Sequence, residues 1–481
     1  MSSERPTIVW FRQDLRLADN PAWHAATMRG GPILPLYILD DGNAGAHRPG
    51  AASRWWLHRS LNALNGELGG FLHVRCGHAD DLLPRIVAAS GAGAVYWNRC
   101  YEPWRIRRDK GIREHLKRDG LQVRSFNGSL LYEPAAIAKD DGSPYRVFTP
   151  YWRNGCLAGP VQPRDVLPRP EKPGLMRMPG DAGLTVDALG LLPGIHWYKG
   201  IEAEWRPGER GARQRLDAFV EQGIAGYRQG RDRPDLPHVS RLSPHLHFGE
   251  ISPHQVREAV LPLAETRQLD DDVDAFLSEL GWREFSYYLL YHWPAITHEN
   301  LQRKFDRFPW RDDPGALDRW QRGQTGYPIV DAGMRELWRT GYMHNRVRMV
   351  TASFLVKNLM QHWHHGEAWF RDTLVDADLA SNSVSWQWVA GSGADAAPYF
   401  RIFNPVTQGT KFDPAGDYVR QYVPEIAGLP DRYLQAPWTA PPDVLAAAGV
   451  TLGDTYPGPV VDLKASRARA LAAFKSLTPA V

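Results

Sequence analysis

Hydrophobic positions follow two alternating patterns from residue 7 to about residue 130. Short runs rich in β-branched and aromatic residues are separated by stretches with apolar residues at three- and four-residue steps. One such stretch covers 53–68, with Ser53 as a candidate helix N-cap. Strands that alternate with helices predict a parallel sheet covered on both faces. The predicted strands are 7–11, 33–39, 72–75, 94–98 and 123–126.

The pattern changes after residue 135. A stretch rich in Pro and Gly, from about 135 to 200, lacks sustained periodicity and predicts a long connector. Beyond residue 205 the apolar residues recur at helical spacing, which predicts an all-α half. The predicted helices are 213–222, 252–266, 272–292, 331–340, 345–362 and 367–374.

The predicted fold is therefore an α/β N-terminal domain with a Rossmann-like parallel sheet, followed by an all-α domain. The predicted boundaries are 1–132 for the α/β domain, 133–204 for the connector and 205–481 for the helical domain. No GxGxxG follows the first predicted strand, so a dinucleotide site of that type is not expected there.

Composition narrows the class of protein. Hydrophobic residues make up 43% and charged residues 23%, as in soluble globular proteins. The 3 cysteines show neither CxxC spacing nor clustering with histidine, so neither a disulfide scaffold nor a metal site is predicted. No apolar leader or membrane-length apolar run is visible, which predicts a cytoplasmic protein with no membrane contact. A net charge of +3 does not by itself indicate nucleic-acid binding. The 19 tryptophans are several times more than ordinary composition leads one to expect, and composition alone does not explain them.

Four motifs carry a resemblance to a known family. They read WFRQDLRLADNP at 10–21, TGYPIVDA at 325–332, MHNRVRM at 343–349, and a stretch from 376 to 405 that contains WQW and YFRIFNP. In type and order they resemble the photolyase and cryptochrome family over nearly the whole chain. The nearest likeness is to cyclobutane pyrimidine dimer photolyases of class I or class III.

The resemblance implies FAD in a U shape inside the helical domain. The stretch 240–244 offers hydroxyls and backbone N–H groups ahead of a helix-prone segment, which suits the pyrophosphate, although such a stretch alone usually forms a turn and cap. Val239 stands where relatives commonly carry threonine, so this chain has no side-chain hydroxyl there for the phosphate. The implied FAD contacts are Tyr227, Ser240, Arg241, Leu242, Ser243, Trp282, Asn345, Arg348, Asp376, Asp378 and Asn382.

Asn382 matches the family's residue at flavin N5. An amide donates or accepts there without adding charge, which favours a reduced anionic flavin. Without the resemblance, an Asp-x-Asp followed by Asn indicates a loop or a helix cap.

Three tryptophans match the family's electron-transfer row, namely Trp386, Trp363 and Trp310. Without the resemblance, buried indoles indicate core packing. The predicted catalytic residues are Glu279, Asn345, Asn382, Trp386, Trp363 and Trp310.

Glu279, Trp282 and Arg283 lie at i, i+3 and i+4, so one helix face presents a carboxyl group, an indole and a cation. This set suits a flipped-out dimer, and flipping itself is a known property of photolyases. The alternative is an exposed ion pair beside a packing tryptophan. The predicted DNA contacts are Arg231, Glu279, Trp282, Arg283, Arg346, Met349, Trp388, Arg401 and Lys411.

Glu102 matches a contact to an antenna folate, while Trp104 and Arg105 replace residues that hydrogen-bond in relatives. We therefore expect methenyltetrahydrofolate, with a deazaflavin or no antenna as alternatives. For Glu102 alone, a helix-start carboxylate is the simpler interpretation.

The implied activity is light-driven repair of cyclobutane pyrimidine dimers in UV-damaged DNA by electron transfer from reduced FAD, in a monomeric protein. The alternatives are a cryptochrome photoreceptor, a (6-4) photolyase, or a flavoprotein that binds DNA without catalysis. The (6-4) enzymes usually carry paired histidines where 343–346 reads MHNR, which favours the cyclobutane substrate.

Overall fold

The computed structural model describes residues 5–171, 173–396 and 400–477. Two compact units make up the chain. The first contains the chain up to Ile224, Ser240–Pro294 and Val375–Ala380, and the second contains Ala225–Val239, Ala295–Leu374 and the chain from Ser381. Within the described residues, no helix has both the length and the apolar character needed to cross a membrane.

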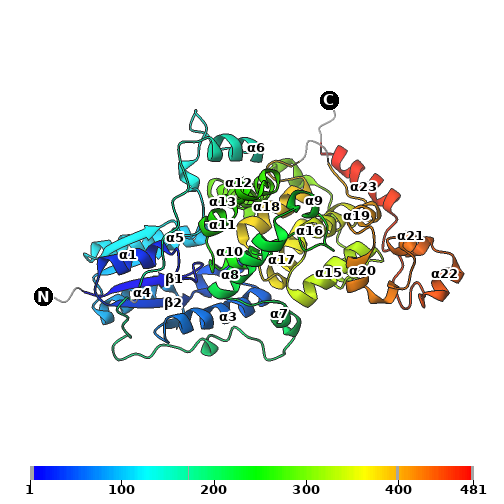
Figure 1. The fold of residues 1–481 in the computed structure, drawn as a ribbon. Helices are drawn as coiled ribbons and strands as arrows, with labels where there is room; N and C mark the ends of the chain where they lie inside the picture. Colours follow the sequence, from blue (N-terminus) through cyan, green and yellow to red (C-terminus); the bar gives the residue numbers. More distant parts are fainter. Residues whose placement is uncertain (1–4, 172, 397–399, 478–481) are drawn as a thin grey trace. The chain divides into compact units, whose positions relative to one another are not determined.

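The first unit contains a parallel sheet of five strands, shown in blue and cyan in Figure 1. The strand order is β3-β2-β1-β4-β5. The strands are β1 (Thr7–Phe11), β2 (Ile33–Leu39), β3 (His73–Cys76), β4 (Ala94–Asn98) and β5 (Gln122–Phe126). The predicted parallel sheet is confirmed.

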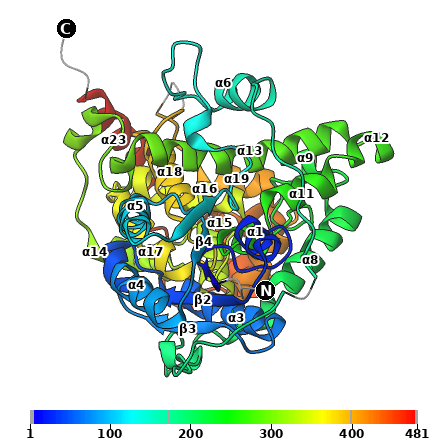
Figure 2. The same ribbon diagram turned by 90° about the vertical axis from the view of Figure 1, so that its left-hand side faces the viewer.

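Helices cover both faces of this sheet. Alternate strand residues such as Ile8 and Trp10 pack in one cluster with residues of α4 (Ala79–Ser90) and α5 (Pro103–Arg118). On the other face, Phe11 lies 5.7 Å from the ring of Trp23 in α1 (Pro21–Arg29). Figure 2 shows β2 and β3 side by side. Burial on both faces explains why the strands are continuous apolar runs.

Some helix ends differ from the prediction. Helix α3 (Ala51–Glu67) begins after Gly50, and Ser53 is buried in its first turn rather than being the N-cap. The predicted helix 252–266 is two helices, α11 (Pro253–Val260) and α12 (Leu263–Arg267). Pro262 has no backbone N–H to donate to the preceding turn of a continuing helix, which accounts for the break.

The remaining long helices of the first unit are α8 (Glu209–Ala218) and α13 (Asp270–His292), and the short α10 (Ser243–His247) precedes α11. The main helices of the second unit are α14 (Pro314–Gln321), α15 (Pro328–Thr340), α16 (Asn345–Ser353), α17 (Trp363–Thr373), α19 (Pro405–Phe412), α20 (Asp417–Tyr422) and α23 (Leu463–Lys475). Helix α18 (Leu379–Ala390) begins in the first unit and continues in the second.

The motif at 325–332 has a structural role. The buried carboxylate of Asp331 accepts hydrogen bonds from Thr325 N at 2.7 Å, Thr325 Oγ1 at 2.6 Å and Gly326 N at 3.0 Å. It also accepts one from the Tyr456 hydroxyl at 2.7 Å. Gly326 has φ +78, and a Cβ there would lie 2.5 Å from the oxygen of Gly458. The motif therefore fixes the start of α15 and requires glycine at this position.

Candidate functional site

Residues far apart in sequence meet around Asp376 and Asp378 in the first unit. Ser243 Oγ donates to Asp376 Oδ2 at 2.6 Å, across 133 positions. The Tyr287 hydroxyl donates to Asp378 Oδ2, and the same oxygen lies 3.4 Å from Nδ1 of His247. Burial and the Asp378 carboxylate raise the pKa of Tyr287 well above its usual value, so this phenol remains a donor. The structure thus joins the predicted 240–244 stretch to the predicted aspartate pair.

The backbone turns sharply at Arg241, which has φ +53 in the left-handed region. Non-glycine residues in that region are uncommon and cluster at functional sites. The Arg241 guanidinium donates to Glu204 Oε1 at 2.5 Å and lies 4.7 Å from the ring of Trp205. Ser240 Oγ accepts from Leu242 N at 3.4 Å. The side chain of Arg241 is therefore held within the protein.

In the second unit, the amide of Asn382 is held in one orientation. Its Nδ2 donates to the Glu367 backbone oxygen at 3.0 Å and to Glu367 Oε1 at 3.2 Å. Burial raises the pKa of Glu367. Since both bonds use the Nδ2 group, the carbonyl oxygen of Asn382 is the atom left for a ligand. A carbonyl oxygen accepts from an N–H, which fits N5–H of a reduced flavin.

Basic side chains gather around Phe412 in the second unit. The guanidinium carbon of Arg346 lies 4.5 Å and Nζ of Lys411 5.0 Å from its ring centroid. Arg346 also forms an ion pair with Asp232 at 2.6 Å. On the same helix, Arg348 Nε donates to the backbone oxygen of Met343 at 2.7 Å. Two of the predicted DNA-contacting cations are thus neighbours.

The other predicted residues of this region occupy α16 and the short α9 (Tyr227–Gly230). Asn345, the first residue of α16, is exposed, and Met349 is half-buried. Tyr227 is buried, and the guanidinium carbon of Arg231 lies 5.7 Å from its ring centroid.

The three predicted electron-transfer tryptophans differ in exposure to solvent. Trp386 and Trp363 are 2% and 0% exposed, whereas Trp310 is half-buried. The ring of His362 lies 5.0 Å from Trp310 and 5.8 Å from Trp363. Trp363 Nε1 donates to Asn300 Oδ1 at 3.1 Å. This gradient is what a route to the surface requires, and the assignment stays a prediction.

The face of α13 that presents Glu279, Trp282 and Arg283 is predicted to bind the dimer. Part of this face contacts other residues of the protein. Trp282 stacks on Phe148, with centroids 3.9 Å apart and planes at 12°. The face that Phe148 covers is therefore closed to a ligand. Arg283 Nη1 donates to the Ser129 backbone oxygen at 2.8 Å, and Glu279 is half-buried.

Sequence reasoning missed Glu284, the next residue on α13. Its side chain is 1% exposed, and Oε2 accepts from Tyr132 N at 3.2 Å. Burial raises its pKa to about 7, and Arg283 opposes that rise. In the sequence, Glu284 only stands next to Arg283. No spacing to other residues therefore identifies it as a buried acid.

The predicted antenna contact Glu102 is buried at the start of α5. It is the N-cap residue, but its side chain makes no capping hydrogen bond, which disfavours the simple helix-start interpretation. Oε1 lies 3.2 Å from Nε of Arg105, whose guanidinium carbon lies 4.6 Å from the ring of Trp104. Within the described residues Oε2 has no hydrogen-bond partner. This oxygen suits an N–H donor of a ligand.

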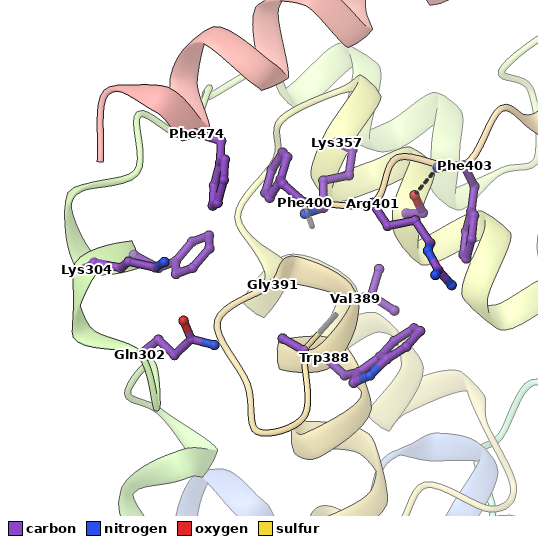
Figure 3. A pocket seen from close by; sticks show the side chains of 13 residues that line it. Gln302, Lys304, Lys357, Trp388, Val389, Gly391, Phe400, Arg401, Phe403 and Phe474 are labelled. Carbon is purple, nitrogen blue, oxygen red and sulfur yellow. Dashed lines mark hydrogen bonds between the residues drawn. The ribbon is translucent and has the colours of Figure 1, made fainter. Parts of the chain in front are cut away.

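Trp388 and Arg401, both predicted DNA contacts, line the same pocket in the second unit (Figure 3). The other lining side chains include Gln302, Lys304, Phe305, Ser353, Lys357, Phe400, Phe403 and Phe474.

Comparison with known protein families gives two matches along the chain. Residues 7–171 match the DNA photolyase model, and residues 276–476 match the model for the FAD binding domain of DNA photolyase. These two segments define a flavin-binding protein with an α/β and a helical part. The second match supports FAD as the cofactor.

Similarity to individual proteins extends over nearly the full length. The chain is 49% identical to a deoxyribodipyrimidine photo-lyase of Agrobacterium fabrum, over 98% of each chain. It is 38% identical to cryptochrome-1 of Arabidopsis thaliana, over 96% of this chain and 69% of that protein. A crystal structure of a bacterial class III photolyase from Agrobacterium tumefaciens superimposes with a TM-score of 0.95 at 48% identity, covering 99% and 98% of the two chains. The chain belongs to the photolyase/cryptochrome family.

Proposed function

We propose that this chain is a deoxyribodipyrimidine photolyase, which repairs cyclobutane pyrimidine dimers in UV-damaged DNA under blue or near-UV light. The observation that carries the proposal is the oriented amide of Asn382, whose Nδ2 is held by Glu367. A neutral acceptor at flavin N5 favours reduced, electron-donating FAD. The 49% identity to a photolyase supports the same function.

Bound FAD, when reduced and excited, supplies an electron to the dimer and recovers it after the ring has split. The residues of the chain bind and orient the cofactor. The Asn382 carbonyl oxygen would accept a hydrogen bond from N5–H of the reduced flavin, and the Asp376 and Asp378 carboxylates would help to hold the same cofactor. We propose the same cofactor contacts as the sequence predicts, namely Tyr227, Ser240, Arg241, Leu242, Ser243, Trp282, Asn345, Arg348, Asp376, Asp378 and Asn382.

The substrate role of α13 rests on Trp282 and Glu279. Because Phe148 covers one face of Trp282, the dimer stacks on the opposite face, and Glu279 hydrogen-bonds a base edge. Arg346 and Lys411 contact phosphates, which position the duplex without reading its sequence. Trp386, Trp363 and Trp310 carry electrons inward to oxidised FAD.

The buried, unbonded oxygen of Glu102 supports a folate antenna, methenyltetrahydrofolate. A carboxylate pairs with the N–H groups of a pterin edge. We further propose a monomer with an antenna domain over 1–132, a connector over 133–204 and a catalytic domain over 205–481.

The test is repair of an oligonucleotide that contains one thymine dimer. Protein with reduced FAD is illuminated with blue light, and restored thymines are quantified by chromatography against a dark sample. We expect light-dependent repair that Glu279→Gln lowers about tenfold. Glu258→Gln removes an exposed carboxylate of α11 and should leave the rate unchanged. If FAD is bound and reduced but no thymine is restored, a photoreceptor role replaces the proposal.

A further inference from the structure

Lys357 is buried in an unusual place for a lysine. It lies in the π-helical turn Phe354–Asn358 that continues α16, and it is 1% exposed. Burial lowers its pKa well below its usual value, and within the described parts of the chain it forms no ion pair with a carboxylate. Removing an amine from water costs several kcal/mol unless its N–H groups find partners. The partners of Lys357 therefore indicate what the residue does.

The first partner is the end of helix α18. Nζ of Lys357 donates to the backbone oxygen of Ala390, the last residue of that helix, at 2.9 Å. The last carbonyl groups of a helix have no partner inside the helix, and a donor at this end stabilises it. Trp388 belongs to the same final turn, and its Nε1 donates to the backbone oxygen of Asp395 at 3.0 Å. Lys357 thus supports the turn that carries Trp388.

The second partner is the segment 400–403. Nζ of Lys357 lies 3.0 Å from the ring centroid of Phe400, where an N–H is attracted to the negative ring face. One turn earlier, Ser353 Oγ accepts from Phe403 N at 3.3 Å. Ser353 and Lys357 lie four positions apart, so one helix face holds this segment at two points. Figure 3 shows Lys357 beside Phe400.

Arg401 lies between these two attachment points. It is exposed and lines the same pocket as Trp388. We propose that Lys357 is a positioning residue for DNA binding, because it fixes the end of α18 and the segment 400–403 so that Trp388 and Arg401 face the same pocket. This inference rests on the proposed function. Since Lys357 is buried, it acts through these two residues and does not itself contact the duplex.

The positioning role has an energetic basis. A segment that is already ordered loses less conformational freedom when a ligand binds. Releasing Phe400 and the end of α18 leaves two contact side chains to be ordered by DNA. The expected result is a dissociation constant about tenfold higher.

The experiment compares Lys357→Met with the native chain. Methionine keeps an unbranched apolar stem and removes the N–H groups. Binding of a dimer-containing duplex is measured in the dark, and the repair rate is then measured at saturating duplex. We expect Lys357→Met to raise the dissociation constant and KM about tenfold and to keep kcat within twofold. FAD content and photoreduction without DNA should match the native protein.

Two further variants distinguish a positioning role of Lys357 from a simple effect of positive charge in the pocket. Lys304→Met removes an exposed lysine that lines the same pocket, and we expect less than a threefold effect on binding. Ser353→Ala removes the acceptor of Phe403 N, and we expect weaker binding in the same direction as Lys357→Met. An equal loss in Lys304→Met shows that charge alone matters and overturns the inference.

The remaining outcomes are also decisive. If Lys357→Met binds the duplex like the native chain, the inference is wrong while the proposed function stands. If Lys357→Met loses FAD or photoreduction, the residue supports the whole unit and the inference is again wrong. If the native protein neither binds nor repairs dimer-containing DNA, the proposed function itself fails.

Discussion

Glu284 allows a quantitative test of how α13 is held. Its carboxyl group is fully buried, and burial raises its pKa from 4.5 to about 7. Below pH 4.5 the group is protonated in both the folded and the unfolded chain. As the pH rises toward 7, only the unfolded chain releases the proton, so the free energy of unfolding falls. At about 1.4 kcal/mol per pH unit, the full loss is about 3 kcal/mol.

The perturbation is Glu284→Gln, which removes the titrating proton and keeps an oxygen that accepts from Tyr132 N. Urea unfolding of both proteins is followed by tryptophan fluorescence at pH 5 and pH 8. We expect the stability of the variant relative to the native chain to increase by about 2 to 3 kcal/mol from pH 5 to pH 8.

Glu258→Gln, at an exposed position of α11, is the control and should show a difference that does not change with pH. If Glu284→Gln also shows the same difference at both pH values, the carboxyl group ionises freely in the folded protein. Burial then does not raise the pKa of Glu284.

Three other variants test separate parts of the site. Trp386→Phe should abolish photoreduction of oxidised FAD, measured by absorbance, yet spare repair by pre-reduced protein; unchanged photoreduction removes Trp386 from the route. Arg346→Ala should lower the slope of log affinity against log salt by about 1, as expected for one lost phosphate contact, whereas an unchanged slope excludes that contact. Glu102→Gln should lower the near-ultraviolet antenna absorbance of the purified protein without changing its FAD content, and an unaltered antenna band contradicts the assigned role of Glu102.

The sheet was predictable because its strands are buried on both faces. Such strands are short apolar runs between turn residues, and β1, β2 and β4 have the predicted bounds. Helix α18 was not predicted, because Leu379–Ala390 is rich in serine and tryptophan and lacks a one-sided apolar pattern. Its tertiary contacts, such as the bond between Asn382 and Glu367, override weak propensity.

The sequence motifs gave predicted residues for the candidate site but not their contacts. The segment predicted to be a long connector supplies Phe148, which stacks on Trp282. No sequence spacing links Phe148 to α13, because that contact depends on how the chain folds back. The same is true of Arg283. It lies on the predicted helix, but no spacing in the sequence indicates that its guanidinium donates to the backbone oxygen of Ser129.

In the proposed repair reaction, reduced FAD donates an electron to a bound dimer and receives it back. The most direct measurement counts thymine dimers repaired per FAD by anaerobic, pre-reduced protein under blue light with no added reductant. We expect many dimers to be repaired per FAD, with the reduced absorption spectrum unchanged at the end. Repair that stops at one dimer per FAD, with the flavin left oxidised, would contradict the proposed reaction.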